Sequence, residues 1–120
     1  MSEARPILLV EDDPGITEVV TWALEDEGFA VISAADGVAA LAAIAVQPPA
    51  LILLDMRMPV MSGADFAIAY RQTPGPHAPI VMLTASGDAA RAASLVYAAD
   101  VLAKPFDLHT LLTVIRRHLG

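Results

Sequence analysis

Five short runs of apolar residues, each followed by a stretch with helical spacing, recur along the chain and constrain its fold more than any other feature. The runs cover residues 7–10, 30–32, 51–54, 80–83 and 101–103. They lack polar alternation, which is typical of strands that are buried on both faces of a sheet. Strands that alternate with helices predict an α/β fold with a parallel sheet covered on both sides.

The segments between these runs carry signals for the ends of helices. Pro14 favours a helix start and Gly28 a helix end, while Asp36 and Ser62 are suited to cap the next two helices. An alanine-rich stretch at 88–97 predicts a fourth helix. Apolar residues at helical spacing then predict a last helix after the fifth strand.

Length and composition exclude several classes of protein. The chain has 120 residues, enough for one domain over residues 1–120, and 56% of them are hydrophobic while 18% are charged, unlike a disordered chain. It has no cysteine, no apolar run long enough to span a membrane, and no secretory-type N-terminus, so we expect a cytoplasmic protein. A net charge of −7 argues against direct binding of nucleic acid or of an acidic membrane surface.

Polar residues stand at the ends of four predicted strands. Glu11 and Asp12 follow the first strand, Asp55 the third, Thr84 the fourth, and Lys104, the only lysine, the fifth. In open parallel sheets, the carboxyl ends of the strands meet at one edge, where sites form near a switch point. We therefore expect these five side chains to meet in one pocket.

Such a pocket would suit phosphoryl transfer. Clustered carboxylates repel one another, and a hard divalent cation with oxygen ligands, such as Mg²⁺, relieves the repulsion. An aspartate can act as a nucleophile and form an acyl phosphate. Mg²⁺, Lys104 and the Thr84 hydroxyl would then neutralise or hydrogen-bond the phosphoryl oxygens, with Asp55 as the acceptor on the central strand.

Four stretches of the sequence resemble the motifs of response-regulator receiver domains. They are residues 8–13, residues 55–59 with Gly63, residues 84–85 and residues 104–106. The similarity covers essentially the whole chain. It implies a flavodoxin-like, doubly wound (βα)5 fold with a five-stranded parallel sheet in the order 2-1-3-4-5.

The resemblance also implies a role for each site residue. Asp55 would be the phosphoacceptor, with Thr84 and Lys104 binding the phosphoryl oxygens. The implied Mg²⁺ ligands are Glu11, mainly through a bound water, Asp12, Asp55 and the backbone carbonyl of Arg57. The peptide bond between Lys104 and Pro105 would be cis. The resemblance implies no other cofactor.

A receiver domain would act in two-component signal transduction. A sensor histidine kinase or a phosphotransfer protein would supply the phosphoryl group, and an output domain or effector protein would respond. The chain would catalyse its own phosphorylation and dephosphorylation without being a turnover enzyme. A homodimer would form through the fourth helix, the fifth strand and the last helix.

Other readings of the sequence weaken at particular residues. A phosphatase of the haloacid-dehalogenase type needs an aspartate two residues after the nucleophile, and Arg57 stands there. Val101 occupies a position that is aromatic in most receivers, which supports a binding module without chemistry, but the intact acids, Thr84 and Lys104 argue against it. A flavin phosphate would be repelled by the acids.

The remaining polar and aromatic residues have ordinary structural readings. Asp13 precedes the first helix, where its charge favours the helix N-terminus. Trp22 is expected to pack at the margin of that helix. We expect His77, His109 and His118 to lie on the surface, without a shared metal.

Overall fold

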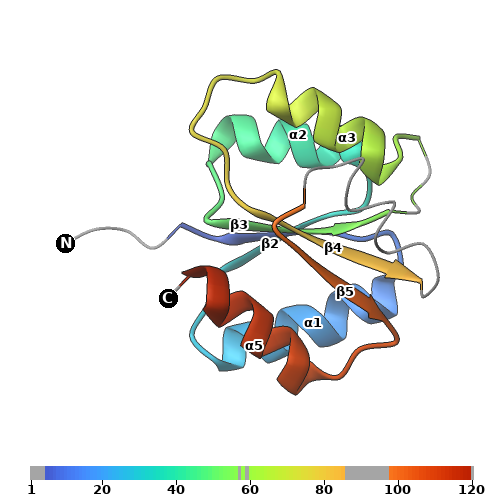
Figure 1. The fold of residues 1–120 in the computed structure, drawn as a ribbon, viewed down its shortest axis with the longest axis vertical. Helices are drawn as coiled ribbons and strands as arrows, with labels where there is room; N and C mark the ends of the chain where they lie inside the picture. The colour runs from blue at the N-terminus through green and yellow to red at the C-terminus, as the bar shows by residue number, and fades with distance from the viewer. Residues whose placement is uncertain (1–4, 57, 59, 86–97, 120) are drawn as a thin grey trace.

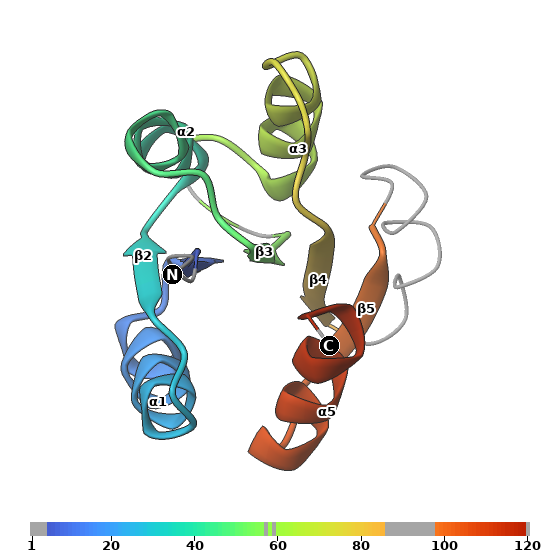
Figure 2. The same ribbon diagram turned by 90° about the vertical axis from the view of Figure 1, so that its left-hand side faces the viewer.

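Five parallel strands lie between two layers of helices in the computed structural model, which describes residues 5–56, 58, 60–85 and 98–119 (Figures 1 and 2). The strands are β1 (Ile7–Val10), β2 (Val31–Ala34), β3 (Leu51–Asp55), β4 (Ile80–Ala85) and β5 (Asp100–Lys104). The helices are α1 (Pro14–Asp26), α2 (Gly37–Val46), α3 (Gly63–Arg71) and α5 (Leu108–Leu119). The order β2-β1-β3-β4-β5 confirms the predicted doubly wound fold. The helix expected at 88–97 lies outside the described residues.

The apolar runs form strands because both faces of the sheet are covered. Successive side chains of a strand point to opposite faces. Leu9 and Leu53 pack with α1 and α5, whereas Leu8 and Leu54 pack with α2 and α3. Figure 2 shows these two helical layers on opposite sides of the strands.

Some strand boundaries differ from the prediction. Residues 30–32 were predicted as the second strand, but β2 runs from Val31 to Ala34 and includes the exposed Ser33. β2 is an edge strand, so the apolar pattern ends before the ladder does. β3 and β5 end at Asp55 and Lys104 as predicted, and β4 runs one residue past Thr84, to Ala85.

Side chains cap the helices at the predicted positions. Asp13, Asp36 and Ser62 each accept a hydrogen bond from a backbone N–H two or three residues later, at 2.8, 2.8 and 3.1 Å. Gly28 follows the end of α1 with a φ of 92°, a conformation that a residue with a Cβ rarely adopts. These caps fix where each helix starts relative to the strand before it.

Trp22 corrects one expectation. Its side chain is 68% exposed and does not pack into the core. The buried residues of α1 are Val20, Ala23 and Leu24, and Trp22 lies outside that stripe of the helix surface. The indole is therefore left on the surface beside β2.

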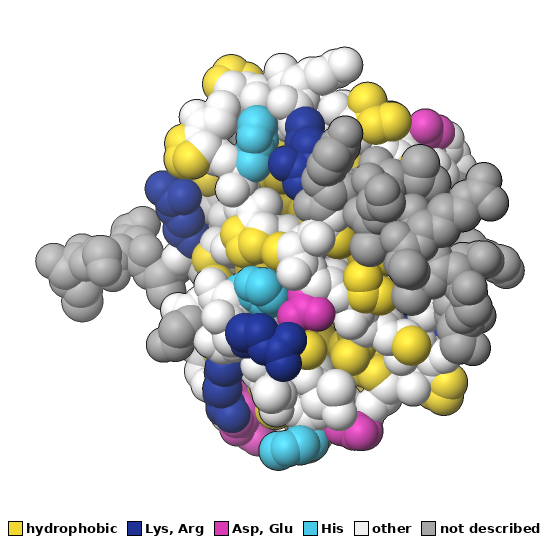
Figure 3. Space-filling model, viewed as in Figure 1, with side chains coloured by type: hydrophobic (Ala, Val, Ile, Leu, Met, Phe, Trp, Pro, Cys, Tyr) yellow, Lys and Arg dark blue, Asp and Glu magenta, His cyan; other side chains and the backbone are white. Residues whose placement is uncertain are grey.

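A cluster at the start of β5 corrects another expectation. The Asp100 carboxylate accepts hydrogen bonds from Arg117 at 2.7 Å and from His118 at 3.1 Å. His118 is only 19% exposed and ties the end of α5 to the sheet, so it is more than a surface residue. Figure 3 shows histidine, arginine and acidic side chains gathered over α5.

Among the described helices, none is both long and apolar enough to cross a membrane.

Candidate functional site

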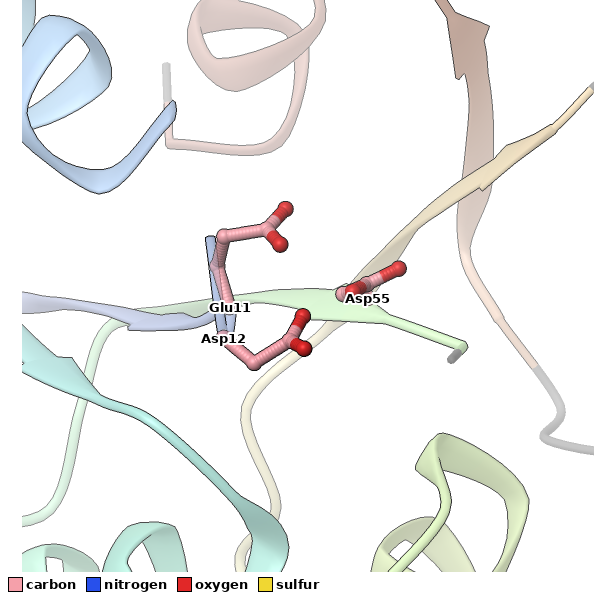
Figure 4. Close-up of side chains that lie close together, drawn as sticks. All are labelled: Glu11, Asp12 and Asp55. Carbon is pink, nitrogen blue, oxygen red and sulfur yellow. The ribbon is translucent and has the colours of Figure 1, made fainter. Parts of the chain in front are cut away.

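Three carboxylates meet where β1 and β3 end. These strands are neighbours, with Val10 opposite Leu54, so the residues that follow lie side by side. Glu11, Asp12 and Asp55 each place a carboxylate oxygen within 4.8 Å of the other two. Figure 4 shows the three carboxyl groups around one common space at the carboxyl edge of the sheet.

Lys104 reaches this cluster from the end of β5. Its ammonium nitrogen lies 2.9 Å from an oxygen of Glu11 and 3.3 Å from an oxygen of Asp55. Of the two contacts, the one with Glu11 is the shorter. The Lys104–Pro105 peptide bond is cis, as expected.

Burial governs the charges of the site. The Glu11 side chain is 1% exposed and that of Asp55 is 5% exposed. Burial raises the pKa of the Glu11 carboxyl above its ordinary value, against the opposing hydrogen bonds from Lys104 and from the Asp13 backbone N–H. Burial alone would lower the pKa of Lys104, but the hydrogen bond to Glu11 and the charge of Asp55 outweigh it, so that pKa is raised. Lys104 therefore stays charged.

One lysine faces three carboxylates, which leaves an excess of negative charge. Glu11 already accepts hydrogen bonds from Lys104 and from the Asp13 backbone, while Asp12 is exposed toward solvent. The donor atoms are all carboxylate oxygens, which suit Mg²⁺ and not zinc. Glu11, Asp12 and Asp55 are thus the candidate cation ligands among the described residues. Arg57, the fourth expected ligand, lies outside the described residues.

Thr84 borders the acids on the next strand. It follows Leu83, which is paired with Asp55, and it stands opposite Ala103 beside Lys104. Thr84 is 7% exposed. The strand register thus brings every described residue of the expected site to one edge of the sheet.

The structure adds a residue to which the sequence assigned no role. A Cβ at Gly63 would lie 2.6 Å from the backbone oxygen of Asp55 and 2.9 Å from the Cα of Met56. Only glycine allows α3 to begin so close to the acceptor strand. The sequence signal was the position of Gly63 within the motif, which gave no reason for the glycine.

The comparisons with known proteins agree with this geometry. The family model that matches is the response regulator receiver domain, over residues 7–116. The chain belongs to this family. DNA-binding response regulator MtrA from Mycolicibacterium smegmatis is 38% identical over 94% of the chain and 50% of the relative. The NtrX receiver domain from Brucella abortus gives a TM-score of 0.86 at 32% identity, covering 94% of this chain and 97% of that one.

A chemotaxis protein has the same architecture. CheY4 from Vibrio cholerae gives a TM-score of 0.84 at 34% identity, with 97% of this chain and 99% of that one covered. The chain is thus a receiver domain of two-component signalling. Members of this family are generally not classical enzymes. It spans half the length of MtrA, which is named as DNA-binding. That this segment itself does not bind nucleic acid stays a prediction.

Proposed function

We propose that residues 1–120 form one receiver domain that accepts a phosphoryl group on Asp55 in a Mg²⁺-dependent reaction and thereby switches a partner-binding surface. The observation that carries the proposal is the position of Lys104. Its ammonium group lies 3.3 Å from the Asp55 carboxylate, beside two further carboxylates. This combination supplies a nucleophile and a fixed positive charge at one point.

In the proposed reaction, a phosphoryl group moves from a histidine of the donor protein to Asp55. A carboxylate oxygen of Asp55 attacks the phosphorus of a phosphohistidine on a histidine kinase or phosphotransfer protein. A P–O bond forms and the P–N bond breaks, and the imidazole leaves with a proton from solvent. Lys104 and the Thr84 hydroxyl bind the negatively charged phosphoryl oxygens as the group moves onto Asp55. Later attack by water on the acyl phosphate returns inorganic phosphate.

The carboxylate cluster fits Mg²⁺ by the chemistry of its donors. Asp12 and Asp55 would hold the ion directly, Glu11 through a water, and the Arg57 carbonyl would complete the set. When bound, Mg²⁺ would neutralise negative charge on a phosphoryl oxygen and on the carboxylates. Without it, the single positive charge of Lys104 faces three carboxylates.

A groove beside the acceptor supports docking of the phosphodonor. It lies between α1 and the segment after β5, with a volume of about 530 Å³. Ile16, Val19 and Phe106 give it apolar walls, and Lys104 lines it. A donor helix seated there would bring its phosphohistidine next to Asp55, because Lys104 belongs to both the groove and the site.

The switched surface includes β5 and α5. A shift of Thr84 toward the phosphoryl group would disturb β5, its neighbour in the sheet. Val101 is half-buried against the α2 and α3 side of the core, so an aromatic ring does not report the shift here. Instead we expect apolar repacking on this face to control an output domain or a homodimer. Beryllofluoride serves as a mimic of the phosphoryl group. Dimerisation that it does not affect would contradict the proposed switch at the β5 and α5 face.

The test is incubation of the full chain with acetyl phosphate and Mg²⁺, followed by intact mass spectrometry. We expect one phosphoryl adduct in the wild-type chain and none after addition of EDTA. Asp55→Asn should give no adduct. Asp65→Asn, an exposed acid on α3, is the matched control and should be phosphorylated as the wild type is.

Each result decides between readings of the chain. An adduct that survives Asp55→Asn would overturn the acceptor assignment. A wild-type chain that takes no adduct from acetyl phosphate or from a phosphohistidine donor, while it remains folded by circular dichroism, would be a binding module without chemistry.

A further inference from the structure

A second groove runs along α1 on the side facing β2 and differs in chemistry from the donor groove. It has a volume of about 520 Å³ and begins at Glu11 and Asp12, at the border of the acceptor site. We call it the α1–β2 groove; its floor and walls include Thr17, Glu18, Thr21, Trp22 and Glu25 of α1 and Ser33 of β2. The receiver chemistry at Asp55 uses none of these six residues.

The α1 residues of this groove form one stripe because of their spacing. Glu18 and Trp22 are four residues apart, and Glu25 follows three residues later, so all three lie on one face of the helix. The exposed indole of Trp22, 68% accessible, therefore lies between two carboxylates. Glu18 and Glu25 are seven positions apart, which is about 10 Å along the helix axis.

The charges of the groove have no local counterpart. Among the described residues that line it, none is lysine, arginine or histidine. Glu18 and Glu25 form no ion pair with any residue that the structure describes. The Thr21 hydroxyl oxygen is buried and has no hydrogen-bond partner in the described part of the chain. The groove thus offers an aromatic face and two carboxylates.

We propose that the α1–β2 groove binds an amphipathic peptide segment of another protein that carries arginines spaced to meet Glu18 and Glu25 and an apolar side chain or guanidinium to cover Trp22. Arginine pairs with carboxylates in a bidentate manner and stacks on indole rings. A second copy of this chain is a poor occupant, because its net charge of −7 would be repelled. Anionic ligands are disfavoured for the same reason.

The single tryptophan of the chain makes the groove directly observable. The probe is a synthetic helical peptide without tryptophan or tyrosine, with two arginines seven positions apart and leucines between them. Titration of the full chain should change the Trp22 fluorescence in a saturable way. A peptide with glutamates in place of the arginines should cause no change, and a peptide with arginines two positions apart should bind more weakly.

Variants separate the groove from the overall charge. We expect the double variant E18Q/E25Q to weaken binding about tenfold, because it removes both carboxylate partners. The matched control D26N/D65N removes two exposed acids outside the groove and should change affinity less than about twofold. W22A, followed by anisotropy of a labelled peptide, should weaken binding about tenfold.

Three outcomes would overturn the proposal. The first is an equal loss in E18Q/E25Q and D26N/D65N, which would indicate long-range attraction alone. The second is peptide binding by anisotropy without any change at Trp22. The third is a Trp22 signal that depends on protein concentration without peptide, which would make a second copy the occupant. Because the readout does not involve Asp55, Asp55→Asn should bind the peptide like the wild type.

Discussion

Two clusters of acidic and basic side chains stand at opposite ends of β5, and they differ in how their charges balance. At the carboxyl end, Lys104 faces Glu11 and Asp55, with Asp12 nearby. At the amino end, Asp100 alone faces two basic side chains from α5. The first cluster has more acids than bases, and the second has the reverse.

The pKa shifts follow this balance. Burial raises the pKa of Glu11, and the Asp55 charge acts in the same direction, against the hydrogen bonds that oppose it. Burial also acts to raise the pKa of Asp100, but hydrogen bonds from His118, from the Val101 backbone N–H and from Arg117 outweigh it, so that pKa is lowered. Enough donors keep a partly buried carboxylate ionised and make it stabilising.

The difference separates a structural cluster from a reactive one. The Asp100 cluster is complete within the chain and fixes α5 on the sheet. The acids around Lys104 repel one another until a cation or phosphoryl group changes the balance. Groups of like charge that destabilise one another in the folded chain are expected at functional sites. We therefore expect the effects of substitutions at the carboxyl end of β5 to depend on Mg²⁺ and those of substitutions at its amino end not to.

The largest effect is expected for Lys104→Met. Removal of the one base leaves Glu11 and Asp55 close together, so we expect the free energy of unfolding without Mg²⁺ to fall by about 2 kcal/mol. Phosphorylation of Asp55 by acetyl phosphate should slow by about 100-fold, since a fixed positive charge is lost. Urea unfolding and intact mass measure the two effects.

The control for this prediction is Arg117→Met at the other end of β5. This substitution should lower the free energy of unfolding by about 1 kcal/mol or less, because the Arg117–Asp100 pair is more exposed. It should leave phosphorylation of Asp55 unchanged. Equal phosphorylation rates in the two variants would show that Lys104 only packs at the site.

Asp12→Asn should separate stability from function. Removal of one of the repelling carboxylates should raise the free energy of unfolding without Mg²⁺ by about 0.5 kcal/mol, and should weaken Mg²⁺ binding by at least about tenfold. The shift of the urea midpoint with Mg²⁺ concentration measures both. If Asp12→Asn is less stable than the wild type, or binds Mg²⁺ as tightly, the claim that the site around Lys104 carries excess negative charge would be wrong.

The sequence predicted the site because its residues stand at strand ends, where the topology brings them together. Glu11 follows a strand, Asp55 and Lys104 each end one, and Thr84 is the last residue but one of β4, and parallel strands align those ends. The sequence could not predict which acid Lys104 approaches more closely. The 2.9 Å contact with Glu11 depends on side-chain conformations, not on strand register.

The cluster at Asp100 was missed for a different reason. Asp100 lies 17 and 18 residues from its partners Arg117 and His118, and none of the three falls in a motif. Their meeting depends on how α5 crosses β5, which periodicity alone does not specify. Trp22 was misjudged because an apolar residue type suggested packing, although its helix position lies outside the buried stripe.

Asp100→Asn tests the complete cluster and should have a moderate effect. Loss of the carboxylate weakens the hydrogen bonds with Arg117 and His118, so we expect the free energy of unfolding at neutral pH to fall by about 1 kcal/mol. Mg²⁺ affinity and phosphorylation should not change. Asp26→Asn, an exposed acid outside the cluster, should have almost no effect in the same urea titrations. A Mg²⁺-dependent difference for Asp100→Asn would break the contrast between the two ends of β5.

The smallest effect is the pH dependence of the stability that Asp100→Asn loses. Because the pKa of Asp100 is lowered in the folded chain, its ionised carboxylate stabilises the fold fully above the unfolded value of about 3.9. The stabilisation is lost as the pH falls through the lower, folded pKa. The difference in unfolding free energy between wild type and Asp100→Asn should therefore persist at pH 5 and shrink below pH about 4. Urea titrations between pH 5 and 3 measure it, and a difference that instead grows below pH about 4 would mean that Asp100 is not held ionised by its partners.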